Sequence, residues 1–261
     1  MYFAAKHKDV KLAQDYADCT GNDSKKALII CDGIGEFEQS NQAAKIVVEN
    51  FIGSVLYNEF EIQHFIKEAQ QEILNSEIIG GTTFICAIND SQNNLKFHYL
   101  GNGGIIHLFG NYNINPYSEY AYRYIELMNP HVTPDGSLYK HISHNSGDFE
   151  LKVDTINLKL NSEVGDIILL FTDGIATLEE KAIIKTEDGI YWRHESEAIQ
   201  IILSRLNDFL IQDANQFSLD GLIGFIEESL KYLKFENKLE DDASLGIIIT
   251  ENVINHYKSM E

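Results

Sequence analysis

Four aspartates lie at the ends of short apolar runs or in short acidic motifs, spread over nearly the whole chain. Two of them follow the runs Ala27–Cys31 and Ile167–Thr172, and a third precedes Leu245–Thr250. Runs of this length that are rich in Ile, Leu and Phe are typical of buried strands. Several strand tips can meet at one sheet edge, where their carboxylates converge as the oxygen ligands that Mg²⁺ and Mn²⁺ prefer. The pattern predicts a metal centre, and hence an enzyme. The four aspartates are Asp15, Asp32, Asp173 and Asp241.

Each motif taken singly has a simpler explanation. Asp-Gly is a very common turn dipeptide, and it occurs again in this chain at Asp135-Gly136 and Asp188-Gly189. The order of the motifs favours a shared site. An early Gln-Asp is followed by a strand with Asp-Gly-x-Gly, a strand with Asp-Gly, and an Asp-Asp pair before a final strand.

The hydrophobic pattern predicts strands at both ends of the chain and two helical blocks between them. Strands alternate with turns over roughly the first thirty residues, and Ser40 is expected to cap a helix whose apolar residues recur from Ala43 to Val55. The stretch 112–147 is expected to be a long loop. Further predicted helices are Phe65–Leu74, Glu197–Leu210 and Leu219–Leu233, and further predicted strands are Thr82–Ile88, Lys96–Leu100, Ile105–Phe109 and Phe149–Leu158. This arrangement fits a β-sandwich flanked by helices.

Composition is consistent with one domain over residues 1–261. No Pro-, Ser- or Gly-rich linker interrupts the chain, which has only three prolines, and a domain of this size is common. The net charge of −20 disfavours nucleic acid as a partner, because phosphate contacts require clustered Lys and Arg. The same charge repels phosphate esters at long range, although bound divalent ions would reverse the local field.

The number and spacing of the cysteines and the N-terminal residues favour a cytoplasmic location for the protein. The three cysteines, Cys19, Cys31 and Cys86, form neither an even disulfide set nor a short metal-ligand spacing. The N-terminal residues lack the order of a signal peptide, and the longest apolar stretches are too short to span a bilayer. We therefore expect a cytoplasmic protein without a membrane partner.

In this order the motifs resemble a known family, the type 2C (PPM) metal-dependent serine/threonine protein phosphatases, and in particular a bacterial branch. The resemblance runs from about Lys6 to Thr250. It implies an α+β fold with four α-β-β-α layers, in which helices flank a central antiparallel β-sandwich. The motifs that carry it are Ala13-Gln14-Asp15-Tyr16, Cys31-Asp32-Gly33-Ile34-Gly35, Gly80-Gly81-Thr82-Thr83, Leu100-Gly101-Asn102-Gly103, Phe171-Thr172-Asp173-Gly174-Ile175 and Asp241-Asp242-Ala243-Ser244.

The resemblance also implies a reaction and a set of ligands. Two Mg²⁺ or Mn²⁺ ions would activate a water that hydrolyses phosphoserine or phosphothreonine on proteins. Asp32 would bridge the ions and the Gly33 carbonyl would complete one shell, while Asp173 and Asp241 would hold one ion and Asp15 the other. A kinase-linked signalling partner is implied as well. Asp32, Asp173 and Asp241 are thus the expected catalytic residues.

Three departures from the family pattern bear on activity. Many members have an Arg upstream of the first acidic motif to bind substrate phosphate, but residues 7–11 contain none. Lys8, Lys11 or His7 is the expected substitute, although a Lys binds phosphate as a point charge without the bidentate fork of Arg. Asn102 and Thr177 stand where many members carry the aspartates of a third metal site. We expect that third site to be weak or absent.

Two other classes of function remain open at this stage. One is a pseudophosphatase or partner-binding module of the same fold, and the other is a phosphatase of small phosphomonoesters. A zinc site at His141 and His144 is disfavoured because the pair lacks a Glu partner and a clear helix. A histidine could act as general acid, but the sequence does not indicate which one.

Overall fold

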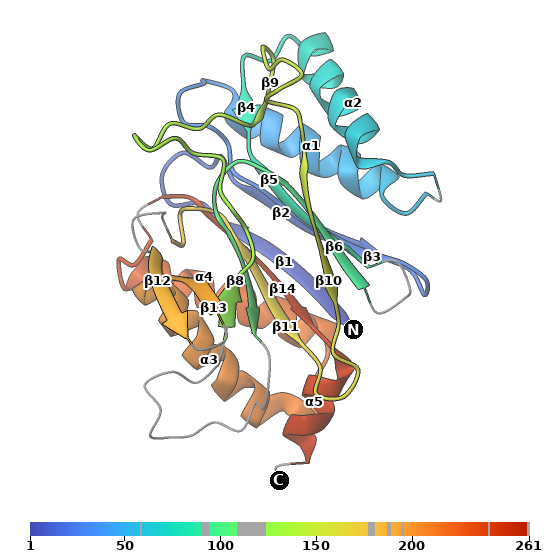
Figure 1. Ribbon diagram of the computed structural model, residues 1–261, viewed down its shortest axis with the longest axis vertical. Coiled ribbons are helices and arrows are strands. Elements are labelled where there is room, and N and C mark those ends of the chain that lie inside the picture. The colour runs from blue at the N-terminus through green and yellow to red at the C-terminus, as the bar shows by residue number, and fades with distance from the viewer. Residues whose placement is uncertain are drawn as a thin grey trace.

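The computed structural model describes residues 1–57, 59–89, 94–108, 124–176, 181–186, 189–194, 196–239 and 241–259, with only the backbone described between 181 and 194. Most of its strands form two antiparallel sheets of five strands, packed face to face (Figure 1). The first sheet has the order β1-β14-β11-β7-β8, with bounds Tyr2–Lys8, Ala243–Ile249, Ile167–Phe171, Gly104–Leu108 and Tyr124–Glu126. The second has the order β10-β6-β5-β3-β2, with bounds Asp154–Lys159, Asn94–Leu100, Phe84–Asn89, Lys26–Cys31 and Tyr16–Gly21.

Apolar residues fill both faces of the central strands, which explains why these strands are continuous apolar runs in the sequence. In β3, Ala27 and Ile29 pack on one side among helices, whereas Leu28 and Ile30 pack on the other side between the sheets. Successive side chains of a strand point to opposite faces, so a strand with both faces covered has no polar position to alternate with.

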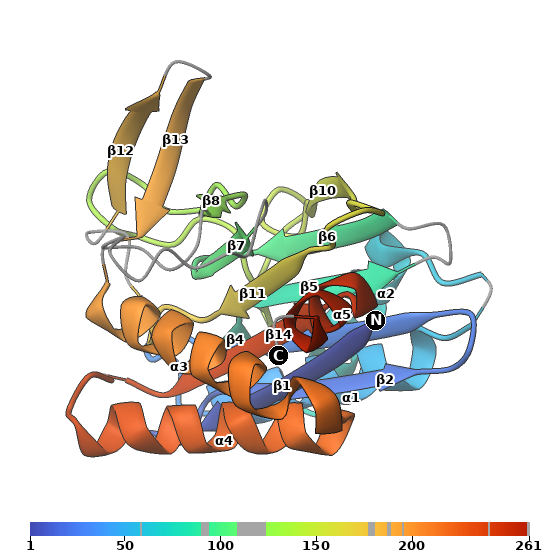
Figure 2. The same ribbon diagram turned by 90° about the horizontal axis from the view of Figure 1, so that it is seen from below.

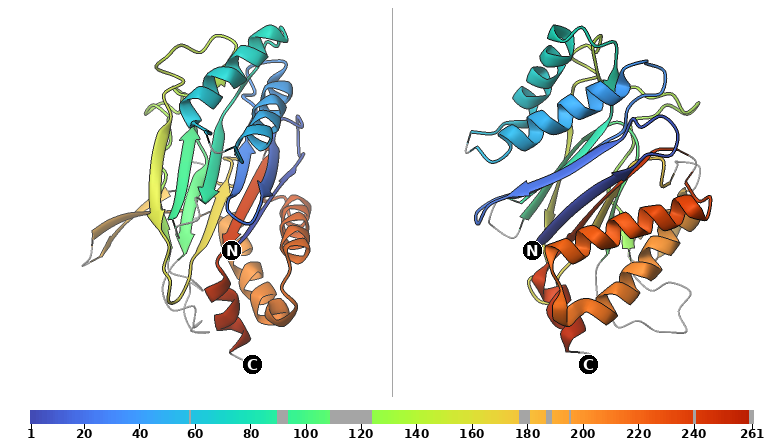
Figure 3. Two further views of the ribbon diagram at one scale, coloured as in Figure 1. Left: turned by 90° about the vertical axis from the view of Figure 1, so that its right-hand side faces the viewer. Right: turned by 180° about the vertical axis from the view of Figure 1, so that it is seen from behind.

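Helices cover the outer faces of the two sheets. Figure 3 shows α1 and α2 (Ser40–Ser54 and Ile62–Asn75) over the β3 sheet, and α3, α4 and α5 (Glu197–Asp213, Leu219–Phe235 and Glu251–Lys258) on the β14 side. Buried residues of α1 recur at helical spacing from Ala43 to Phe51. The predicted four-layer α-β-β-α fold is confirmed. None of the described helices is long and apolar enough to cross a membrane.

Several predicted boundaries were wrong for local reasons. Ser40 is the first residue of α1 and not its cap, because its hydroxyl donates to the carbonyls of Ile34 and Phe37 in the preceding loop. The strand predicted over Phe149–Leu158 begins only at Asp154, after a turn. Phe109 lies outside the described residues.

The stretch 112–147 is not entirely a loop. Its described part contains β8 and the short strand β9 (Ile142–Ser143), which pairs with β4 (Gly81–Thr82), while residues 112–123 lie outside the described part. A hairpin of β12 and β13 (Lys181–Thr186 and Gly189–His194) was not predicted, and it extends away from the sandwich in Figure 2.

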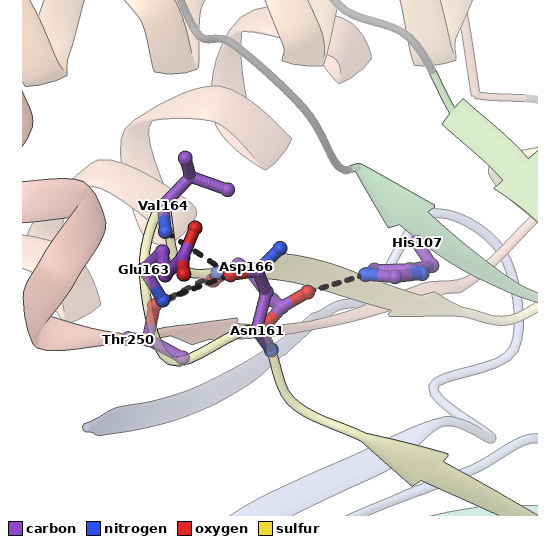
Figure 4. Close-up of polar contacts among 6 residues, drawn as sticks. All are labelled: His107, Asn161, Glu163, Val164, Asp166 and Thr250. Atoms are coloured by element: carbon purple, nitrogen blue, oxygen red, sulfur yellow. Dashed lines mark hydrogen bonds and ion pairs between the residues drawn. The ribbon is translucent and has the colours of Figure 1, made fainter.

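A buried polar network joins three strands at one end of the sandwich (Figure 4). Nε2 of His107 lies 2.7 Å from Oδ1 of Asp166, and Oδ2 of Asp166 accepts the Asn161 N–H at 2.6 Å. The Thr250 hydroxyl accepts the Asp166 N–H at 2.8 Å. His107 and Thr250 lie toward the ends of β7 and β14 that are remote from Asn102 and Asp241, so this network stabilises the end opposite the four aspartates.

Candidate active site

Strand register brings Asp15 and Asp32 together at one end of the second sheet. Tyr16 pairs with Cys31 in the antiparallel β2–β3 ladder, and Asp15 and Asp32 are the next residues outward. Directly opposite residues of such a ladder point to the same face, with Cβ atoms roughly 5 Å apart.

The facing sheet delivers Asp173 and Asp241 to the same end. Phe171 pairs with Gly104 on one side, which places Asn102 opposite Asp173 two residues further along. The ladder with β14 is also antiparallel and pairs Phe171 with Leu245, so Asp241 lies at the same end, two residues before the first residue of β14. Four aspartates from both ends and the middle of the chain therefore meet where the two sheets come together.

Asp15 is the most enclosed of the four and links the sheets. Its side chain is only 1% exposed. Oδ2 of Asp15 accepts the Thr172 hydroxyl at 2.8 Å, and Oγ1 of Thr172 accepts the Ser244 N–H at 2.8 Å. The loop before β2 is thereby bonded to the strand end that carries Asp173.

Burial and mutual repulsion raise the pKa values of Asp15, Asp32 and Asp173. Burial raises the pKa of Asp15 to about 7, with a further contribution from the charge of Asp173 and opposition from the Thr172 hydrogen bond. Burial and the charges of Asp173 and Asp15 raise the pKa of Asp32 well above its usual range. Burial and the charge of Asp241 raise the pKa of Asp173 against opposing hydrogen bonds. A cation placed among these carboxylates would favour their charged forms.

The oxygen atoms of the cluster suit a hydrated hard cation. Oδ1 of Asp15 is buried without a hydrogen-bond partner among the described residues, which is costly for a carboxylate oxygen. In that same part of the chain, no three His, Cys, Asp or Glu side chains form a preassembled ligand group. Mg²⁺ needs no such group, since it keeps several waters and is commonly held by one or two carboxylates. The donors therefore fit Mg²⁺ or Mn²⁺ better than zinc, which prefers nitrogen and sulfur.

A cavity of about 640 Å³ opens beside the carboxylates. Asp32, Asp173 and Asp241 line one part of it, and the segment 135–141 contributes Asp135 and His141 to another. None of the described residues that line it is Lys or Arg. The cavity is large enough for a phosphoryl group, but without a bound cation its charge would repel one.

The two candidate phosphate-binding lysines lie outside this lining. Lys8 is half-buried at the end of β1, opposite Ala243 of β14. Lys11 is exposed in the following loop, where Nζ lies 4.0 Å from Oδ2 of Asp241. Lys11 is therefore the better placed of the two to approach a ligand in the cavity.

Close packing explains two glycines beside the aspartates. A Cβ on Gly33 would lie 2.8 Å from Cβ of Gln14, and a Cβ on Gly174 would lie 1.9 Å from the carbonyl oxygen of Asp242. Both distances are too short for any side chain. The loops that carry the four aspartates are thus pressed against one another through these glycines.

Asp242 anchors the loop that leads to Asp15. Its two carboxylate oxygens accept the N–H groups of Val10, Lys11, Leu12 and Gln14 at 2.6, 2.8, 3.1 and 2.8 Å. Although burial raises it, the pKa of Asp242 is lowered overall by these backbone donors. The carboxylate thus serves as a structural anion and is not free to bind a metal.

Replacement of Asp242 by alanine is expected to destabilise the fold by about 2–4 kcal/mol, because backbone donors lose a charged acceptor. The midpoint of chemical denaturation measures this loss. Asp9→Ala is the matched control, since Asp9 is an exposed acid of the same segment and surface changes usually stay within about 0.5 kcal/mol. Equal stability of the two variants would contradict the anchoring role.

Comparisons with known proteins bear on the fold alone. No family model and no curated protein matches the chain. Among solved structures, the S. agalactiae serine/threonine phosphatase is similar with a TM-score of 0.66 and 13% identity, covering 95% of this chain and 99% of that one. Stp1 from Staphylococcus aureus is similar with a TM-score of 0.63 and 15% identity, covering 96% of each chain. RsbX in complex with magnesium is similar with a TM-score of 0.54 and 14% identity, covering 95% of this chain and 94% of that one.

The chain has the bacterial serine/threonine phosphatase fold. The resemblance found in the sequence is therefore confirmed at the level of the fold. Within this phosphatase fold, the four aspartates predicted from the sequence converge at one end of the sandwich. Thr177, which was weighed for a third metal, lies outside the described residues.

Asn102 has a contact that the sequence could not indicate. Its Nδ2 donates to Oδ2 of Asp173 at 2.5 Å, and its Oδ1 is buried without a partner among the described residues. A neutral amide here holds the Asp173 carboxylate in place, where a carboxylate would repel it.

A buried histidine clamps the turn that carries Asn102, and sequence reasoning missed it. Nδ1 of His131 accepts the Gly101 N–H at 3.0 Å, so Nε2 carries the proton and donates to Oδ2 of Asp154 at 2.8 Å. The ring stacks on Tyr99 with centroids 4.9 Å apart. Burial lowers the pKa of His131 against the opposing effect of Asp154. No local sequence pattern marks this role, because its partners are distant in the chain.

Proposed function

We propose that the chain is a metal-dependent phosphatase that hydrolyses phosphoserine and phosphothreonine on proteins. The observation that carries the proposal is the convergence of Asp15, Asp32, Asp173 and Asp241 beside one cavity, with raised carboxylate pKa values and an unpartnered buried oxygen. Perturbed titratable groups in a cleft are typical of functional sites.

In this proposal, each ligand takes one role. Asp32 and the carbonyl oxygen of Gly33 would help to hold two Mg²⁺ or Mn²⁺ ions. Asp173 and Asp241 would hold one ion, and Asp15 would hold the other directly or through water. Asp32, Asp173 and Asp241 are the residues on which catalysis depends most.

The bound ions would neutralise charge on the phosphoryl oxygens and lower the pKa of a coordinated water. The chain's own residues position the ligands of these ions. The strand tips fix the carboxylates, the Asn102 amide orients Asp173, and Asp242 immobilises the loop before Asp15. A third metal site remains weak or absent in this proposal, because an amide stands at Asn102.

The proposed substrate class is taken from the names of the similar solved structures. The S. agalactiae protein and Stp1 are named serine/threonine phosphatases, and RsbX was crystallised with magnesium. We infer a cytoplasmic phosphoprotein substrate, a kinase-linked signalling partner, and a single catalytic domain over residues 1–261. Both chain ends contribute aspartates to the proposed centre, which supports one domain.

A substrate panel in the presence of Mn²⁺ tests the proposal. Hydrolysis of p-nitrophenyl phosphate reports a working centre, and release of phosphate from phosphoserine and phosphothreonine peptides reports the substrate class. Turnover of small metabolite esters without peptides would indicate a small-molecule phosphomonoesterase. Absence of turnover on every substrate would leave a pseudophosphatase that binds phosphoproteins without hydrolysis.

Lys11→Ala is expected to raise KM for a phosphopeptide severalfold with little change in kcat or in Mn²⁺ affinity, because a contact to substrate phosphate contributes to binding and not to the metal shell. Lys8→Ala, assayed separately, is expected to have the smaller effect, since Lys8 is half-buried at the end of β1, whereas Nζ of Lys11 lies 4.0 Å from Oδ2 of Asp241 beside the cavity. If neither substitution changes kcat/KM by more than about twofold, the phosphate is held without these lysines.

A further inference from the structure

His141 lines the cavity, and strand pairing fixes where it stands. Thr82 pairs with Gly33 on one side and with Ile142 on the other, in antiparallel register on both sides. His141 immediately precedes Ile142. Three segments that are far apart in the sequence therefore run side by side at this edge of the cavity.

One residue along this ladder, Asp32, Thr83 and His141 form a row. The Thr83 N–H donates to the Asp32 carbonyl at 2.9 Å, which supports the register. Directly opposite residues share a face, and all three residues line the cavity. With neighbouring strands about 4.8 Å apart, the backbones of Asp32 and His141 are separated by about 10 Å with Thr83 between them, and the cavity that all three residues line is large enough for a phosphoryl group.

One ring nitrogen of His141 makes no hydrogen bond to the described residues. Its Nδ1 is buried and has no hydrogen-bond partner among the described residues. Nearby His144 differs, because its Nδ1 lies 3.3 Å from the Gly80 carbonyl oxygen and its ring packs edge-on against Phe37. A buried polar atom without a partner is unusual in a folded protein and calls for a reason such as a ligand that supplies the partner.

The charges around the ring suit a proton donor. Burial lowers the pKa of His141, while Glu150 and then Glu36 act in the opposite direction. Among the described residues that line the cavity there is no Lys or Arg to compete for a phosphate. A dianionic phosphate entering the cavity would favour the imidazolium form, so the substrate itself promotes protonation of the ring.

We propose that His141 is the general acid that protonates the leaving oxygen of a phosphoserine or phosphothreonine substrate, an inference that rests on the proposed phosphatase function. A water oxygen forms the new bond to phosphorus, and the ester P–O bond breaks with its electron pair moving to the serine or threonine oxygen. The imidazolium N–H gives its proton to that oxygen. One water proton remains on inorganic phosphate, the other passes to solvent, and His141 regains a proton from solvent.

Leaving-group dependence tests this role. p-Nitrophenolate departs as a stable anion and needs no proton, whereas a serine alkoxide does. Wild type, His141→Gln and His144→Gln are assayed with Mn²⁺ on p-nitrophenyl phosphate and on a phosphoserine peptide. General acids typically raise the rate of the chemical step by about 10²–10⁴-fold. We therefore expect His141→Gln to lower kcat/KM by about 100-fold or more on the peptide. On p-nitrophenyl phosphate we expect the same substitution to lower kcat/KM by less than about threefold. His144→Gln is expected to change both substrates alike.

Each outcome decides the question. Equal loss on both substrates, or no loss on either, in His141→Gln overturns the general-acid role while the wild-type turnover keeps the phosphatase proposal intact. Wild-type protein that hydrolyses neither substrate overturns the phosphatase proposal and this inference with it. Thermal unfolding and Mn²⁺ titration of the variant are measured beside the kinetics, and a matched loss of stability with equal kinetic losses identifies a structural role.

Discussion

Asp32→Asn is expected to lower kcat on p-nitrophenyl phosphate by at least about 1,000-fold, roughly 4 kcal/mol in the activation free energy. The substitution keeps the shape of the side chain but removes the charge that would hold both ions. The same change is expected to raise the melting temperature of the metal-free protein, because it removes a buried carboxylate that is repelled by Asp173 and Asp15. Burial and then these two charges raise the pKa of Asp32 in the wild type. A loss of turnover together with a rise in melting temperature is expected when a residue serves function at the expense of stability.

The control for Asp32→Asn is Asp23→Asn, which makes the same change at an exposed turn residue. It is expected to leave both activity and melting temperature close to the wild-type values. Circular dichroism checks that each variant is folded. A folded Asp32→Asn protein with wild-type turnover would remove Asp32 from the proposed metal centre.

Removal of divalent metal is expected to abolish hydrolysis of p-nitrophenyl phosphate, and Mg²⁺ or Mn²⁺ is expected to restore it. Ca²⁺ is expected to fail, because its larger and looser coordination shell polarises water less. The same titration has a second readout. Ions that bind only the folded state raise its stability as their concentration exceeds the dissociation constant, so Mg²⁺ and Mn²⁺ should raise the melting temperature of the chelated protein.

Asp32→Asn provides the matched control for the metal titration, because the rise in melting temperature should shrink when the bridging charge is lost. Activity that survives exhaustive chelation would contradict the proposed mechanism. A melting temperature that does not change when Mg²⁺ or Mn²⁺ is added would contradict metal binding at the carboxylates, independently of any activity assay.

Much of the fold could be predicted because its signals are local. The apolar runs that became β3, β11 and β14 are buried on both faces, and the helical periodicity from Ala43 onward matches α1. The errors arose where local signals compete. Ser40 has the chemistry of a helix cap, but two carbonyls of the loop before α1 take its hydroxyl. The hairpin of β12 and β13 lies between better-marked elements, and within the described part of the chain its strands pair only with each other.

The amino-acid sequence was enough to predict that these four aspartates would meet, because each lies beside a rigid strand end or in a short acidic motif whose order along the chain is informative. It could not determine what surrounds them. The raised pKa of Asp15, the anchoring of residues 10–14 by Asp242 and the clamp of His131 on Gly101 all depend on contacts between segments 30 to 232 residues apart. Such contacts are set by strand register and by the packing of one sheet on the other. For the same reason, His141 was one histidine among nine in the sequence, and only the Thr82 ladder placed it across the cavity from Asp32.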